Sequence, residues 1–116
     1  MKNVKIFISL VPGTHDLQLT DSEGHSGGAE DFVSDVNRGD IVTWRLAENS
    51  GIDDLTGIVA KDGVFNIFIS GEPYKRPNGT WHGIIKSDAS GVEAYNIDFK
   101  IGQNVFSVDP KIRVKI

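Results

Sequence analysis

Three histidines have the widest chemical repertoire in this sequence: His15, His25 and His82. Neutral imidazole nitrogens suit zinc and copper, so three of them offer the donors for a metal site. Metal motifs usually place at least two ligands close together on one rigid element. Here the nearest pair is ten positions apart, across a glycine-rich loop. We therefore expect three separate surface histidines.

The loop Thr20–Asp31 carries several side-chain oxygens. Calcium prefers carboxylate and carbonyl oxygens on a flexible loop. The spacing of a calcium-binding EF-hand loop is missing, because His25 stands at its fifth position and Phe32 at its twelfth. We expect a mobile acidic hairpin loop. A metal-binding protein that uses the histidines and this loop remains the alternative function.

Signatures of catalysis are missing from the sequence. The chain has no cysteine, which excludes thiol catalysis, disulfides and thiolate metal sites. It contains neither a Gly-x-Ser-x-Gly nucleophile turn nor a Gly-x-x-x-x-Gly-Lys-Ser/Thr phosphate loop. We expect a protein that is not an enzyme and needs no cofactor.

The segment Ser70–His82 has the composition of a binding loop. Two prolines stiffen it, and two aromatic residues offer flat apolar area at low entropic cost. The candidate partner surface consists of Tyr74, Lys75, Arg76, Trp81 and His82. It would recognise a peptide, a glycan or a sister subunit. In the alternative interpretation, Trp81 packs under the loop with Gly83 and Ile85, and the segment only crosses between sheets.

Length and charge limit the remaining options. The chain has 116 residues, 39% of them hydrophobic and 24% charged, which predicts one globular domain over residues 1–116. The net charge of −4 argues against a general nucleic-acid binder. Seven carboxylates and a single base lie between Asp16 and Asp40. They form either an acidic face for a cation or basic partner, or merely solvated loops.

The beginning of the chain predicts a strand. Lys2 and Lys5 precede an apolar run that stops after six residues at Pro12, which is too short for a signal peptide or a membrane span. We expect a cytoplasmic protein or an exported protein already trimmed, with no membrane contact.

Short alternating segments separated by glycines predict the elements that hold these residues. Asp62-Gly63 between two apolar runs predicts a two-residue hairpin with a type I′ turn. Residues 29–37 fit both a strand and a short helix, and the alternation favours the strand. The expected strands are Val4–Leu10, Leu17–Thr20, Phe32–Val36, Ile41–Leu46, Leu55–Lys61, Val64–Ile69, Thr80–Lys86, Ala94–Ile101 and Lys111–Ile116.

These segments predict an all-β fold, an antiparallel Greek-key β-sandwich of about seven or eight short strands. The run Asp35–Trp44, a strand followed by a Gly-Asp turn and a Val-Thr-Trp strand, resembles a stretch of the cupredoxins, the plastocyanin- and azurin-like β-sandwiches. The ending Phe106–Val114 fits the closing strand of such a sandwich. An immunoglobulin-like sandwich is the alternative, although its Cys…Trp…Cys signature is missing.

The resemblance implies a fold and not an electron-transfer function. Without cysteine, and with its one methionine at position 1, the chain cannot form the His₂Cys copper site of the family. We therefore expect a non-enzymatic binding or structural module. Its partner is a second copy or another protein, because open sandwiches leave strand edges that need cover.

Overall fold

The computed structural model describes residues 2–115 and is built from β-strands. In chain order they are β1 (Asn3–Leu10), β2 (Leu17–Asp21), β3 (Ser26–Gly28), β4 (Val33–Asn37), β5 (Ile41–Leu46), β6 (Asp54–Ala60), β7 (Tyr74–Lys75), β8 (Trp81–Ile84), β9 (Gly91–Ile101), β10 (Asn104–Val108) and β11 (Lys111–Lys115). No helix in the described chain is long and apolar enough to cross a bilayer. The expected all-β class is confirmed.

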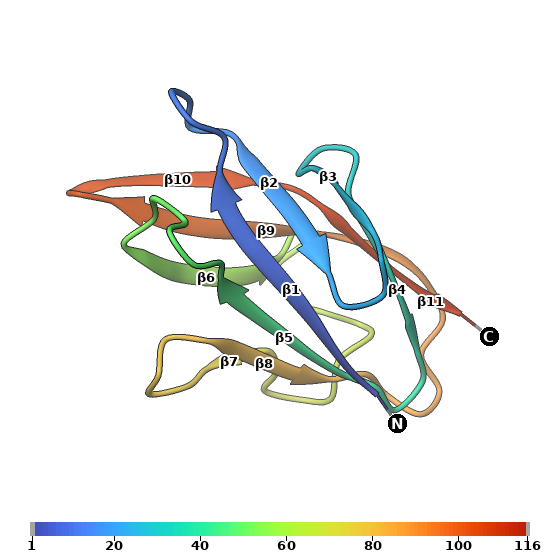
Figure 1. Ribbon diagram of the computed structural model, residues 1–116. Coiled ribbons are helices and arrows are strands. Elements are labelled where there is room, and N and C mark those ends of the chain that lie inside the picture. Colours follow the sequence, from blue (N-terminus) through green and yellow to red (C-terminus); the bar gives the residue numbers. More distant parts are fainter. Residues whose placement is uncertain (1, 116) are drawn as a thin grey trace.

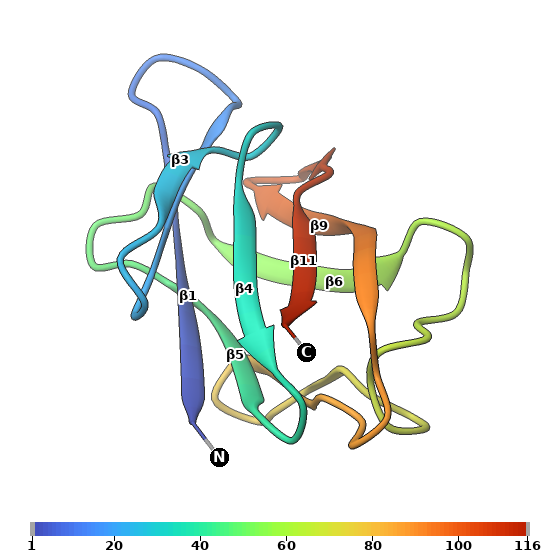
Figure 2. The same cartoon turned by 90° about the vertical axis from the view of Figure 1, so that its right-hand side faces the viewer.

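The strands form two sheets that pack together like the layers of a sandwich (Figures 1 and 2). The first has the order β3-β2-β1-β5-β8-β7. In the second, β9 pairs with β6 on one side and with β10 and β11 on the other, and β4 follows β11. Pro110 separates β10 from β11, and it has no backbone N–H to donate to a ladder.

Both sheets are mixed, which corrects the antiparallel prediction. β1 runs parallel to β5, and β4 runs parallel to β11. The physical reason is the crossing of the chain between the layers: it passes to the second sheet at β4 and returns to lie beside β1 in the same direction. The strand number was also wrong, because the described residues hold eleven strands. The two shortest, β3 and β7, have three and two residues.

The ambiguous residues 29–37 lead into a strand, as the alternation favoured. In β4 the side chains of Ser34 and Val36 are buried, whereas Val33 and Asp35 are partly exposed. The expected strands at Val4–Leu10, Leu17–Thr20, Ile41–Leu46 and Ala94–Ile101 are confirmed. Ile116, the expected end of the last strand, lies outside the described residues.

The predicted hairpin at Asp62-Gly63 is wrong. β6 pairs with β9, and Val64–Ile69 forms only one isolated bridge, between Phe68 and Ile85. Ile67 and Phe68 are consecutive and both buried, which a strand with one wet face cannot accommodate. The prediction paired residues 64–69 with the strand before the turn. In the structure β9, which has a long apolar face, pairs with that strand instead. Gly63 does have a positive φ of 93°.

Replacing Gly63 with valine is expected to destabilise the protein by more than about 1 kcal/mol, because a β-branched residue is strained at positive φ. The readout is the denaturant midpoint. Gly28→Val is the matched control, since Gly28 lacks a positive φ and has open space around it. Equal midpoints for the two variants would show that the turn does not depend on glycine.

The core lies between the sheets and is held by side chains from both. Trp44 of β5 is fully buried, as a core residue should be, and its indole Nε1 donates to the Tyr95 hydroxyl of β9 at 3.0 Å. Burial raises the pKa of Tyr95 far above its usual range, so this hydroxyl remains protonated. The sheets are thus joined by a polar contact as well as by apolar packing.

Candidate functional site

The five predicted surface residues lie at one edge of the first sheet. Tyr74 and Lys75 form β7, Arg76 is exposed in the turn after it, and Trp81 and His82 begin β8. Tyr74 stands opposite His82 in the ladder, with the ring centroids 5.7 Å apart. The hairpin therefore brings the five residues to one edge, but their side chains have different environments.

Trp81 and Lys75 both make contacts with β6 of the opposite sheet. The half-buried Trp81 donates its indole N–H to the backbone oxygen of Leu55 at 2.9 Å. Lys75 forms an ion pair with Asp54 at 2.7 Å. These contacts support the structural interpretation of Trp81. Of the five predicted surface residues, Tyr74 and Arg76 therefore remain the most accessible to a partner.

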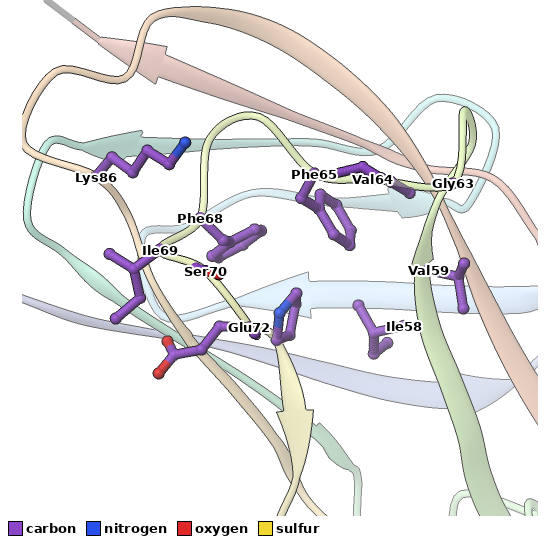
Figure 3. A pocket seen from close by; sticks show the side chains of 13 residues that line it. Ile58, Val59, Gly63, Val64, Phe65, Phe68, Ile69, Ser70, Glu72 and Lys86 are labelled. Carbon is purple, nitrogen blue, oxygen red and sulfur yellow. The ribbon is translucent and has the colours of Figure 1, made fainter.

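A cleft of about 410 Å³ adjoins this edge, between the end of β6 and the loop of residues 61–73 (Figure 3). Ser70, Gly71, Glu72 and Pro73 of the predicted binding loop line it. Three of its other lining residues are large apolar side chains that remain exposed: Val59 at 42%, Val64 at 73% and Ile69 at 38%.

The loop is anchored in the core, and this anchoring shapes the cleft. Phe68 is buried and packs edge-on against Phe65, with ring centroids 5.0 Å apart. It lies so close to β8 that a Cβ on Gly83 would stand 2.7 Å from its ring. Val64 lies just before Phe65 and Ile69 just after Phe68, and the side chains of Val64 and Ile69 remain exposed.

Two opposite charges lie at the cleft. Glu72 accepts a hydrogen bond from the backbone N–H of Ile84 at 2.6 Å, which fixes its carboxylate. Lys86 lines the same cleft, and its ammonium has no ion-pair partner among residues 2–115. The cleft thus combines an apolar surface with one anion and one cation.

Sequence reasoning missed most of this cleft because it assigned Val64–Ile69 to a hairpin arm. An available signal was the adjacent apolar pair Ile67 and Phe68, which breaks strand alternation. Nothing local indicates that the chain around this pair forms one wall of a cleft with β6.

The three histidines have different neighbours in the structure. His15 is exposed and stacks on Phe106, and His82 is half-buried beside Tyr74. His25 lies between two carboxylates, with Nδ1 at 2.9 Å from Asp21 and Nε2 at 3.3 Å from Asp35. Within residues 2–115 no three His, Asp or Glu side chains are grouped so as to hold a metal ion.

The acidic loop does not present all of its carboxylates to solvent. The Asp21 side chain is fully buried and accepts hydrogen bonds from the backbone N–H groups of Glu23 and His25, both at 2.9 Å, and from the Ser34 hydroxyl at 2.7 Å. Beside it, two hydrogen bonds from Arg113 hold the pKa of Asp35 below its usual range. Asp21 therefore serves to join β2 to β4.

Neither a scan against protein-family profiles nor a search of curated protein sequences found a match to this chain.

Proposed function

We propose that the protein is a non-enzymatic, cupredoxin-like Greek-key β-sandwich that acts as a structural binding module and associates with a second copy of itself. The association face is the 410 Å³ cleft together with the adjoining edge strand β6. The observation that carries the proposal is the gathering of Val59, Val64 and Ile69, three exposed large apolar side chains, at one cleft. A cleft bordered by several exposed large apolar side chains is a candidate interaction site.

The local arrangement around Gly39 supports the proposal of a cupredoxin-like fold. β4, a Gly-Asp turn and β5 follow one another, as in the cupredoxin stretch that residues 35–44 resemble. Gly39 in this turn has a φ of 83°. The buried Asp40 fixes the turn, because its carboxylate accepts the backbone N–H of Asn37 at 2.8 Å and that of Lys2 at 2.9 Å. The lack of a cysteine is the reason to propose no electron-transfer role.

The charges of the cleft favour a second copy as its occupant. In a two-fold dimer each copy presents the same patch, so a residue i that meets j is matched by j meeting i. A patch with one anion and one cation is suited to this symmetry: Glu72 of one copy can face Lys86 of the other, and the reverse. The apolar side chains then cover each other in the centre.

The edge of the second sheet strengthens this argument. Within residues 2–115, β6 has a ladder partner on one side only, namely β9, and Val59 lies on β6. An edge strand beside exposed apolar side chains is a surface that proteins normally cover. Self-association at this face would cover both at once.

The test is a charge placed on this face. Val64→Glu is expected to weaken self-association by at least about tenfold, because a carboxylate is costly to bury without a partner. Val105→Glu is the matched control, since Val105 is 63% exposed on β10 and does not line the cleft. Sedimentation velocity of the parent and both variants gives the readout.

An effect of Val64→Glu alone supports the proposed face. Equal association of all three proteins would contradict it, as would equal weakening by both variants. A parent protein that is monomeric at every concentration would refute self-association itself.

A further inference from the structure

The turn between β7 and β8 holds an asparagine followed by a glycine, Asn78-Gly79, and this pair occurs once in the sequence. Asn78 is exposed, and Gly79 has a positive φ of 89°. The turn is closed by two backbone hydrogen bonds, from Gly79 N–H to the Arg76 oxygen at 2.9 Å and from Arg76 N–H to the Thr80 oxygen at 2.8 Å. Because glycine has no Cβ, no side chain shields the nitrogen of residue 79 from the amide group of Asn78.

The side-chain amide of Asn78 is held in one orientation. Its Oδ1 accepts hydrogen bonds from the Thr80 backbone N–H at 3.1 Å and from the Thr80 hydroxyl at 2.7 Å. A backbone N–H can only donate, so the atom that faces it is the oxygen and not the nitrogen. Two donors on one carbonyl oxygen stabilise the negative charge that develops there when its carbon is attacked, as the donors of an oxyanion hole do.

The turn lies at an end of the first sheet, where local opening is easiest. β7 has two residues, and among residues 2–115 its ladder partner is β8 alone. Segments with few ladder bonds open at a low cost in free energy. Opening releases the Gly79 nitrogen from the Arg76 oxygen, which it must leave before it can attack a carbon atom. The folded turn therefore slows the attack, and its place at the sheet end permits it.

We propose that Asn78 is a site of spontaneous deamidation, promoted by the hydroxyl of Thr80. Hydroxide removes the proton of the Gly79 amide, and this nitrogen attacks Cγ of Asn78. The new N–Cγ bond gives a tetrahedral intermediate with its negative charge on Oδ1, beside the Thr80 donors. The Cγ–Nδ2 bond then breaks, ammonia leaves with a proton from water, and a succinimide ring remains.

Water completes the reaction by opening the ring at either carbonyl. Attack at Cγ breaks the Cγ–N bond and gives aspartate, whereas attack at the backbone carbonyl carbon gives isoaspartate, in which the chain runs through Cγ. In both products a carboxylate replaces a neutral amide, so the turn gains a negative charge next to the exposed Arg76. The inference is independent of self-association, because residues 76–80 do not line the cleft of the association face.

The experiment is incubation of the folded parent protein in mildly alkaline buffer. Isoelectric focusing follows the acidic product, and peptide mass spectrometry assigns it. Conversion of Asn78 to aspartate and isoaspartate is expected to be at least about tenfold faster than conversion of Asn104, which is exposed but precedes the branched Val105. Asn78→Gln should lose the acidic product, because glutamine must close a six-membered ring.

A matched pair of variants tests the part of Thr80. Thr80→Val keeps the shape of the side chain without the hydroxyl, and its residue 78 is expected to deamidate at least about threefold more slowly. Thr80→Ser keeps the hydroxyl and should deamidate like the parent. Far-ultraviolet circular dichroism establishes that each variant retains the fold.

Three outcomes would overturn the proposal. Absence of aspartate and isoaspartate at position 78 would show that the folded turn does not react, and equal rates at Asn78 and Asn104 would show that the turn has no special reactivity. A rate in Thr80→Val that equals or exceeds that of the parent and of Thr80→Ser would refute promotion by the hydroxyl.

Discussion

Trp44→Ala is expected to leave the protein largely unfolded or insoluble. The indole is fully buried, with Phe68 at 5.7 Å and Tyr95 at 5.8 Å between ring centroids. Removing a buried tryptophan typically costs about 3–5 kcal/mol, and the loss also leaves the Tyr95 hydroxyl without its donor. A domain of this size has a total stability of only about 5–15 kcal/mol.

Two variants make this result interpretable. Trp44→Phe keeps most of the volume and removes the hydrogen bond, so its unfolding midpoint should lie between those of the parent and Trp44→Ala. Trp81→Ala should remain folded, because Trp81 is only half-buried and makes one hydrogen bond across the sheets. If Trp44→Ala melts like the parent while Trp81→Ala collapses, the core is assigned to the wrong tryptophan.

Asp21→Ala is expected to lower the free energy of unfolding by about 2–4 kcal/mol. The carboxylate has no exposed surface and satisfies two backbone N–H groups and the buried Ser34 hydroxyl. Alanine leaves these donors without acceptors and removes the link between β2 and β4. Urea unfolding followed by tryptophan fluorescence measures the change.

Asp88→Ala serves as the control for Asp21→Ala, because it removes the same charge from an exposed position. Its midpoint should match that of the parent. Ser34→Ala should reproduce only part of the loss, since it removes one of the donors and leaves the backbone bonds intact. Equal stability of the Asp21 and Asp88 variants would mean that the buried carboxylate contributes nothing to holding the sheets together.

Much of the strand content could be predicted from local pattern. β9 alternates from Tyr95 to Ile101, and its residues Tyr95, Ile97 and Phe99 are buried as that alternation requires. Pairing partners could not be predicted in the same way, because they depend on which distant strand arrives at each edge. β1 and β5 became parallel neighbours because the chain crosses to the other layer between them.

For the candidate sites, too, residue types could be predicted from the sequence but contacts between distant residues could not. Tyr74 and Trp81 were recognisable by residue type and the surrounding prolines, yet the inward contact of Trp81 depends on Leu55, twenty-six positions away. Asp21 looked like one carboxylate of a solvated acidic loop. Its burial follows from Ser34 on β4, a neighbour that composition cannot reveal. The cleft of the association face is lined mainly by one stretch, residues 58–73, which the predicted hairpin had paired wrongly, with Lys86 added from the segment after β8.

The molar mass of the parent protein in solution tests the proposed function most directly. Sedimentation equilibrium over about a hundredfold range of concentration should show a rise from the monomer value of 12.7 kDa towards twice that mass. High salt should shift the association only modestly, since apolar contacts lie at the centre of the face. A mass that stays at the monomer value throughout the range would contradict the proposal.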